Sequence, residues 1–207
     1  MVVDDRVVDD DYAGDTGNRG LPTAMYSDAL LALQQQQLIA YPTEAVFGLG
    51  CDPDSEAAVN KLLELKQRPI EKGLILVAAS VEQLTDYIAL DTLDEQQWKR
   101  IEASWPGPNT WVIPKQVGVP EWLSGKFDSL AVRVSAHPVV QELCLAYGKP
   151  IVSTSANLTG EPPCRTYTEV KAQLGDRLGA IVDAPCGPSS NPTQIRDALT
   201  NQVLRPS

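Results

Sequence analysis

Apolar residues along the chain alternate between short continuous runs and stretches in which they recur three and four residues apart. Continuous runs are typical of strands buried on both faces, and the longer period is typical of helices packed on one side. We expect strands at 38–41, 73–79, within 105–115 after its proline turn, 130–134, 150–152, 181–182 and 203–204. This alternation predicts an α/β or α+β domain built on one mixed sheet.

Helix boundaries are marked by capping residues, prolines and glycines. One helix is expected at about 22–37, and residues 52–55, DPDS, are a good start for a second helix that Pro69 ends. His137-Pro138 opens a later helix that Gly148 closes, and residues 187–192 form a loop. Three pairs have capping-box spacing and predict further helix starts: Ser80 with Gln83, Thr92 with Glu95, and Thr166 with Glu169.

The N-terminal segment differs in composition from the rest of the chain. Its first 20 residues contain six Asp and two Arg and so contribute −4 to the formal net charge of −10. It has neither a basic region nor an apolar core, so it is not a secretory signal, and no later run approaches the ~20 apolar residues of a membrane helix. We expect an acidic, mostly disordered arm over 1–21 and a single domain over 22–207.

Charge and cysteine usage exclude two classes of protein. The overall charge of −10 repels a phosphate backbone, which disfavours a stable duplex-binding module. The four cysteines include no Cys-x-x-Cys pair and His137 is the only histidine, so a zinc site is disfavoured. Free thiols in the reducing cytoplasm are the interpretation that we prefer.

Residues 149–160, KPIVSTSANLTG, place a burst of small hydroxyl side chains after a buried strand. The cluster is a nucleophile, a cradle for an anion, or a solvated turn. A serine nucleophile needs an adjacent oriented base, and His137 at a helix start is poorly placed to be one. The segment also lacks Gly-x-Ser-x-Gly, which leaves a Ser-Lys dyad with Lys66 or Lys72 as the remaining nucleophilic arrangement.

An anion cradle needs cationic partners, and the sequence supplies them. Lys66 continues the inward face of the helix that carries Leu62 and Leu63, so its ammonium must find a carboxylate or a ligand phosphate. The alternative is a helix C-terminus at which Lys66 and Arg68 complement the helix dipole. Arg133 lies in a strand opposite Val132 and Val134, and a buried arginine is expected to have an anionic partner.

The segment 41–50, YPTEAVFGLG, combines a rigid proline, a Thr-Glu pair and alternating small and large residues. It indicates a bent strand pair around a pocket, or alternatively a hairpin at a sheet edge.

Five motifs together resemble the YrdC-like family, and in particular its bacterial single-domain L-threonylcarbamoyladenylate synthases. They are YPTEAVFGLGCD, LKQRP, SWPGPNTWVIP, LAVRVSAHP and STSANLTGEPP, and the match covers residues 24–206. The resemblance implies an open, twisted mixed sheet with a concave, ligand-binding face. It also implies a cytoplasmic enzyme that joins L-threonine, bicarbonate and ATP, with Mg²⁺, into threonylcarbamoyl-AMP and pyrophosphate. The product would pass to proteins that modify the tRNA adenosine next to the anticodon.

The resemblance also assigns roles to matching positions. ATP phosphates and catalysis fall to Lys66, Arg68, Ser155 and Asn157, a nucleotide contact to Arg205, and threonine binding to Thr43, Arg133 and Ser153. The chain departs from the two-domain relatives at 71–74, where EKGL replaces Asn-Pro-Leu followed by His, and at Pro162-Pro163, where they have a serine. Two alternatives stay open: an RNA-binding module of the same fold with a weak or transient tRNA contact, and a serine amidohydrolase built on Ser153 or Ser155.

Overall fold

The structure, a computed structural model, describes residues 26–189 and 191–207. The predicted acidic arm over 1–21 lies outside the described residues. Each of the four cysteines is a free thiol, and three of them are buried.

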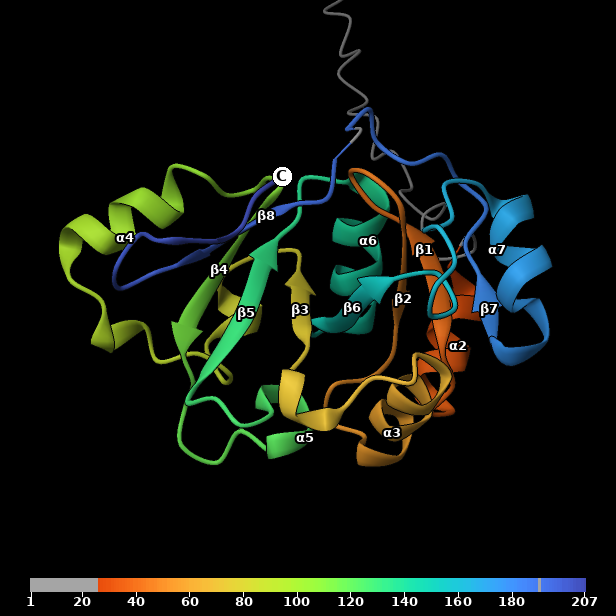
Figure 1. Ribbon diagram of the computed structural model, residues 1–207, viewed down its shortest axis with the longest axis horizontal. Coiled ribbons are helices and arrows are strands. Elements are labelled where there is room, and N and C mark those ends of the chain that lie inside the picture. The colour runs from red at the N-terminus through yellow and green to blue at the C-terminus, as the bar shows by residue number, and fades with distance from the viewer. Residues whose placement is uncertain (1–25, 190) are drawn as a thin grey trace, which may run out of the picture.

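The described residues form one mixed sheet in the order β7-β1-β2-β6-β3-β5-β4-β8-β9 (Figure 1). Neighbours are parallel in the pairs β1–β7, β3–β5 and β4–β8 and antiparallel in the others. The strands are β1 (Ile39–Pro42), β2 (Phe47–Gly50), β3 (Ile75–Ala78), β4 (Asn109–Pro114), β5 (Ser129–Val134), β6 (Ile151–Ser155), β7 (Ala180–Ile181), β8 (Gln194–Asp197) and β9 (Val203–Arg205). The predicted mixed α/β fold is confirmed.

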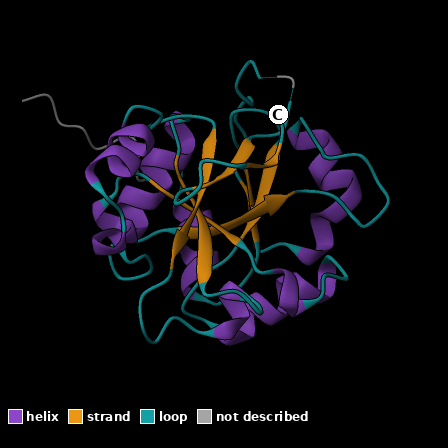
Figure 2. Ribbon diagram, turned by 60° about the vertical axis from the view of Figure 1, so that its left-hand side comes forward, coloured by secondary structure: helices purple, strands orange, loops and turns teal. Residues whose placement is uncertain are grey.

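Helices flank the sheet on both sides (Figure 2). They are α2 (Ser27–Gln34), α3 (Glu56–Leu65), α4 (Glu95–Glu102), α5 (Glu121–Ser124), α6 (Pro138–Tyr147) and α7 (Tyr167–Leu174). Within 26–189 and 191–207 there are also four 3₁₀ turns: η1 (Ile70–Lys72), η2 (Glu82–Leu84), η3 (Leu90–Thr92) and η4 (Gly175–Arg177). Among the residues that the structure describes, no helix has the length and apolar character required to span a membrane.

Successive side chains along each strand point to opposite faces of the sheet, and the two faces contact different helices. Helices α2 and α6 cover part of one face, where they pack against Ile39, Val77 and Ile151. The other face is packed against α3, α4, α5 and α7 through the intervening positions, among them Leu76 and Val152. The part of the first face that α2 and α6 leave uncovered forms the floor of a cavity. The register of the strands places the residues of this floor side by side: Ser153 beside Ile75, Ile75 beside Ala131, and Ala131 beside Val112.

The close approach of β1, β2 and β6 depends on glycine. A Cβ added to Gly50 would lie 2.4 Å from the Val152 carbonyl oxygen and 2.8 Å from the Tyr41 ring. No side chain fits there, so glycine lets the buried Tyr41 ring lie against β2. The segment 41–50 is therefore the predicted strand pair, and the hairpin-edge alternative is wrong because β7 and β6 flank the pair.

Several predicted boundaries are confirmed. Ser55 caps α3 by accepting a hydrogen bond from Ala58 N, Pro138 is the first residue of α6, and Gly148 ends α6 at φ +84°. Thr166 and Glu169 form the predicted capping box of α7. The last strand, β9, is an edge strand as expected.

Two predicted capping boxes are wrong. Gln83 accepts a hydrogen bond from Ala79 N, and the turn η2 that follows has no side-chain cap. Helix α4 is capped by a box of Asp94 and Gln97, two residues after the predicted pair. Three-residue spacing alone does not distinguish neighbouring candidates, because Ser, Thr and Asp all accept from the first turn.

Candidate active site

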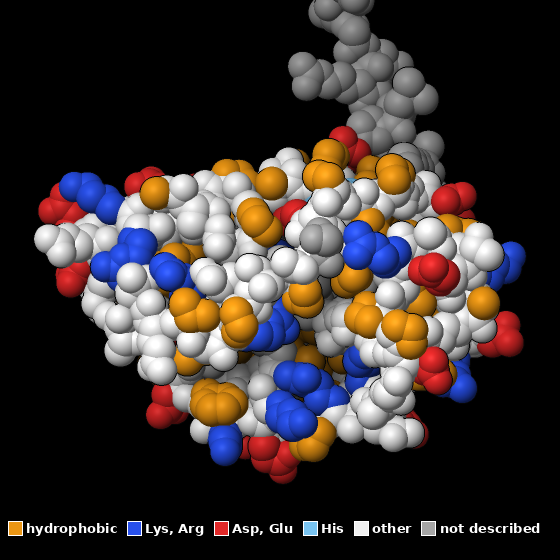
Figure 3. Space-filling view, turned by 45° about the horizontal axis from the view of Figure 1, so that its top comes forward, with side chains coloured by type: hydrophobic (Ala, Val, Ile, Leu, Met, Phe, Trp, Pro, Cys, Tyr) orange, Lys and Arg blue, Asp and Glu red, His pale blue; other side chains and the backbone are white. Residues whose placement is uncertain are grey.

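A cavity of about 640 Å³ lies over the uncovered part of the sheet. Four cationic side chains line it, whereas Asp197 is its only acidic residue among those described. Figure 3 shows a hollow on this side of the molecule with Lys and Arg side chains around it. In a protein of net charge −10, this concentration of positive charge indicates a binding site for an anion. The cations are Arg68, Lys72, Arg133 and Arg205.

A second hollow of about 740 Å³ lies beside α3 and η4. It is larger, but its charged residues are of both signs, with Lys61 and Arg177 facing Glu64, Glu161 and Asp176. None of the eight predicted site residues lines it. The cationic cavity is therefore the candidate site.

Lys66 joins two segments that lie far apart in the sequence. Its Nζ donates to the Ser155 carbonyl oxygen at 2.9 Å, to the Asn157 carbonyl oxygen at 2.7 Å and to Asn157 Oδ1 at 2.8 Å. Among the described residues, three amide oxygens and not a carboxylate contact this ammonium, and the ligand phosphate stays a prediction. The lysine clamps the end of β6 to the C-terminus of α3.

The surroundings of Lys66 favour its neutral form more than water does. Burial, with the nearby charge of Arg68, lowers the pKa of Lys66 from 10.5 to about 8. An ammonium held in such a place gains more from a nearby anion than an exposed lysine does.

Arg68 is held by a turn that folds back on itself. Its Nε and Nη2 donate to the Gly73 carbonyl oxygen at 3.2 and 2.8 Å. Gly73 adopts φ +62°, and a Cβ on it would lie 2.9 Å from the Ser124 carbonyl oxygen, so the turn requires glycine. This arrangement fixes the guanidinium while leaving Nη1 without a hydrogen bond to the described residues. Lys72, on the same turn, also lines the cavity.

The hydroxyl cluster after β6 is ordered by its own hydrogen bonds. Ser155 Oγ donates to Asn157 Oδ1 at 2.6 Å, and Thr159 Oγ1 donates to the Lys66 carbonyl oxygen at 2.6 Å. Ser153 also lines the cavity and is buried, and the nearby Tyr41 OH donates to the Val152 carbonyl oxygen at 3.1 Å. On the opposite wall, Thr43 Oγ1 donates to the Val46 carbonyl oxygen at 2.7 Å.

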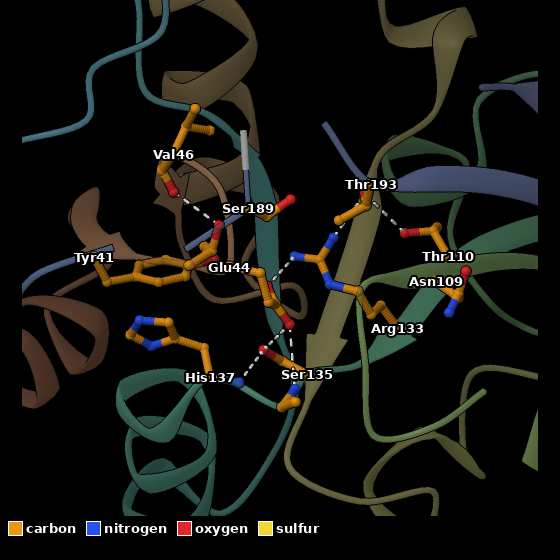
Figure 4. A network of polar contacts seen from close by, with 12 residues as sticks. Tyr41, Glu44, Val46, Asn109, Thr110, Arg133, Ser135, His137, Ser189 and Thr193 are labelled. Carbon is orange, nitrogen blue, oxygen red and sulfur yellow. Dashed lines mark hydrogen bonds and ion pairs between the residues drawn. The ribbon is translucent and has the colours of Figure 1, made fainter. Parts of the chain in front are cut away.

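Arg133 lies at the centre of a buried polar network (Figure 4). Its residue exposure is 5%, and its Nη2 lies 3.6 Å from Glu44 Oε2. The expected anionic partner of this arginine is therefore Glu44. Arg133 Nη1 donates to Thr193 Oγ1 at 2.9 Å, and Arg205 Nη2 donates to the Thr193 carbonyl oxygen at 2.8 Å. Thr193 thus connects the two arginines.

The structure brings the eight predicted residues to one place. Six of them line the cavity: Thr43, Arg68, Arg133, Ser153, Ser155 and Arg205. Lys66 and Asn157 lie behind this wall and hydrogen-bond to Ser155. Sequence reasoning missed Thr193, which no pattern marks, and considered Lys72 only as a base in a Ser-Lys dyad although it lines the cationic cavity.

The described residues do not assemble a serine hydrolase. The His137 ring contacts the Pro185 carbonyl oxygen through Nε2 at 3.2 Å, and Ser155 Oγ donates to an amide oxygen. Lys66 contacts the backbone oxygen of Ser155 rather than its hydroxyl. Neither a triad nor a Ser-Lys dyad is formed.

No group of three or more His, Cys, Asp or Glu side chains suited to a metal ion occurs within 26–189 and 191–207. Asp197 Oδ1 is already engaged by the backbone N–H groups of Leu199 and Thr200. The cavity therefore offers no carboxylate cage of the kind that holds Mg²⁺ without help from a ligand.

Comparisons with known proteins identify the class. A family model described as "Telomere recombination", for Sua5, YciO and YrdC proteins, matches residues 31–207. The chain belongs to this Sua5/YciO/YrdC family, which confirms the resemblance drawn from the five motifs. E. coli YciO shares the fold, with a TM-score of 0.76 at 24% identity over 89% of each chain.

Two further relatives carry more specific descriptions. A protein of Klebsiella pneumoniae named threonylcarbamoyl-AMP synthase is 59% identical over 188 residues, which are 91% of this chain and 98% of the relative. A crystal structure of P. abyssi Sua5 complexed with L-threonine matches with a TM-score of 0.80 and 32% identity. The match covers 88% of this chain, which spans 54% of that longer protein.

Proposed function

We propose that the protein is a threonylcarbamoyl-AMP synthase, which converts L-threonine, bicarbonate-derived CO2 and ATP to threonylcarbamoyl-AMP and pyrophosphate. The observation that carries the proposal is the convergence of Lys66 with Ser155 and Asn157 beside a cationic cavity. Support comes from the relative of that name at 59% identity across nearly the whole chain. The threonine complex of P. abyssi Sua5 gives a precedent for the amino-acid substrate in this fold.

The reaction needs positioning and charge neutralisation rather than a protein nucleophile. The amine of threonine attacks CO2 and loses a proton, which gives a carbamate. A carbamate oxygen then attacks the α-phosphorus of ATP, the bond to the β-phosphate oxygen breaks, and pyrophosphate leaves. A cavity of about 640 Å³ is in the usual range for a small-molecule site and can hold the reactants together.

Roles within the cavity follow from charge and position. Lys66 offsets negative charge on the α-phosphate and on the departing pyrophosphate from behind the cavity wall, and Arg68 does so through a charged hydrogen bond that contributes about 1.5–3 kcal/mol. Ser155 and Asn157 orient phosphate oxygens, and Arg205 contacts the nucleotide. The remaining three predicted residues, Thr43, Arg133 and Ser153, hold threonine, with Arg133 and Ser153 near its carboxylate.

Mg²⁺ enters the proposal only as the counter-ion of ATP. Asp197, the one carboxylate that the described residues contribute to the cavity, is hydrogen-bonded to its own turn and does not form a cage. The ion is therefore held by phosphate oxygens and water, and no described residue is assigned as its ligand.

We further propose a cytoplasmic location and transfer of the product to proteins that place threonylcarbamoyl on tRNA.

Pyrophosphate release tests the function directly. With ATP and bicarbonate present, we expect release that requires L-threonine and that falls strongly when L-serine replaces it. An RNA-binding module without synthase activity releases no pyrophosphate under any of these conditions. A serine amidohydrolase forms an adduct with an acyl-serine trap, detected by mass spectrometry, whereas the proposed synthase does not.

The lowered pKa of Lys66 predicts a pH dependence. Because that pKa is about 8, the ammonium predominates below pH 8 and the neutral amine above it. The neutral amine does not attract phosphate, so kcat/KM for ATP is expected to fall as the pH rises through about 8. Lys66→Arg keeps its charge throughout this range and should show no such fall. If kcat/KM for ATP does not fall across this pH range in either protein, Lys66 does not act on the phosphates.

A further inference from the structure

The buried Arg133 is incompletely satisfied by its neighbours. Its Nη1 donates to Thr193 Oγ1 at 2.9 Å, but its Nε has no hydrogen-bond partner among the described residues. Its Nη2 lies 3.6 Å from Glu44 Oε2, which exceeds the 2.7–2.9 Å of a charge-assisted hydrogen bond. The guanidinium therefore keeps donors free on a wall of the cavity.

Glu44, in contrast, is held firmly on one side. Its Oε1 accepts from Ser135 Oγ at 2.7 Å and from Ala136 N at 3.2 Å (Figure 4). Ser135 Oγ in turn accepts from His137 N at 3.1 Å, so the start of α6 fixes the hydroxyl that fixes the carboxylate. Two bonds to one oxygen restrict rotation of the whole carboxylate.

The backbone of Glu44 is equally constrained. Its carbonyl oxygen accepts from Ser189 N at 3.1 Å, and Gly187 N donates to the neighbouring Thr43 carbonyl oxygen at 2.9 Å. A Cβ on Gly187 would lie 2.7 Å from the Glu44 carbonyl oxygen, so only glycine permits this contact. The loop that follows β7 thus packs closely against the turn that carries Glu44 and is hydrogen-bonded to it.

The second carboxylate oxygen faces Arg133 without a hydrogen bond. Glu44 Oε2 is buried and has no hydrogen-bond partner within the described part of the chain. Glu44 is not one of the residues that line the cavity, whereas its neighbours Thr43 and Ala45 are. Its remaining effect is electrostatic: it holds the arginine in place and compensates its charge while leaving N–H donors for another anion.

We propose that Glu44 is a positioning residue that holds Arg133 with its free donors toward the carboxylate of the amino-acid substrate. The proposal rests on the proposed function, which places threonine at Arg133. It adds a separate requirement, namely that a residue with no substrate contact sets the affinity for the amino acid and not the affinity for ATP.

Glu44→Gln is the variant that tests this role. Glutamine keeps the volume and an oxygen for Ser135 and Ala136, but it presents no charge to Arg133. Isothermal titration calorimetry with L-threonine should give a dissociation constant raised by about tenfold or more. The KM for ATP should stay within about twofold, since Lys66 and Arg68 are untouched. Ser135→Ala, which keeps both charges but frees the carboxylate, should weaken threonine binding by a smaller factor.

A matched control and a double-mutant cycle separate positioning from a general loss of structure. Glu142→Gln alters another part-buried carboxylate, which accepts a hydrogen bond from Tyr26 OH at 2.8 Å and does not line the cavity. This variant should bind threonine and ATP with unchanged affinity. In an Arg133→Met background, Glu44→Gln should cause no further loss of threonine binding, because the residue through which it acts is gone. Circular dichroism and thermal unfolding establish that each variant is folded.

Each outcome decides the matter. Unchanged threonine affinity in Glu44→Gln, equal losses for threonine and ATP, or losses that add in the double variant would overturn the positioning role. If the wild type binds threonine and Glu44→Gln binds it with the same affinity, this inference alone is overturned. A wild-type protein that neither binds threonine nor releases pyrophosphate overturns the proposed function, and the inference falls with it.

Discussion

Lys66→Met is expected to lower the rate of threonine-dependent pyrophosphate release by a factor between about 10 and about 100. Methionine keeps an unbranched side chain, one atom shorter than that of lysine, and removes its charge. Two losses then combine: the phosphate loses a neighbouring positive charge, and the oxygens of Ser155 and Asn157 lose the group that holds them together. Because these oxygens lie at the end of β6, the hydroxyl cradle loses its fixed geometry as well.

Steady-state assays with ATP varied at saturating threonine measure the effect, and Lys61→Met is the matched control. Lys61 belongs to the same helix, is exposed and donates to the Gln36 carbonyl oxygen at 3.0 Å, so its loss should leave the activity unchanged. A Lys66→Met protein that folds normally and retains its activity would show that the phosphate assignment is wrong.

Arg133→Met is expected to reduce the free energy of unfolding by about 3–5 kcal/mol, because it leaves Glu44 as a buried and unpaired charge. A loss of this size lowers the midpoint of thermal unfolding by roughly 10 °C in a protein of this length. Threonine binding should be weakened in the same variant more strongly than in Glu44→Gln. Adding Glu44→Gln removes the unpaired charge and should restore most of the stability without restoring threonine binding.

Urea unfolding of the single and the double variant, beside the wild type, and calorimetry with threonine give both quantities. Lys99→Met is the control, since its exposed ion pair with Glu95 on α4 contributes little to stability. If Arg133→Met unfolds at the same urea concentration as the wild type, the Arg133–Glu44 pair does not hold the site together. If the double variant regains threonine binding, Arg133 does not contact the substrate.

The sequence predicted the parts of the fold that depend on local chemistry. Apolar alternation located most strands, and it placed Arg133 on the face opposite Val132 and Val134, where the structure has it. Helix periodicity turned Lys66 inward, and this orientation is confirmed by its bonds to Ser155 and Asn157. These inferences work because burial and period act over a few residues.

What the sequence left open depends on long-range register. Lys66 meets amide oxygens 89 and 91 residues away, and no pattern near residue 66 states that the end of β6 supplies them. Strand β8, which places Thr193 between two arginines, is short and only half-buried, so it has no strong apolar signal. Glu44 was visible as part of the Pro-Thr-Glu motif, but its partnership with Arg133 depends on the pairing of distant segments.

A crystal structure with a non-hydrolysable ATP analogue, α,β-methylene-ATP, shows directly where the nucleotide binds, since the bond that would break is blocked. We expect the triphosphate in the cationic cavity, beside Arg68 and against the end of β6 that Lys66 holds. An analogue bound with its phosphates in the hollow beside α3 and η4, or anywhere outside the cationic cavity, would contradict this expectation.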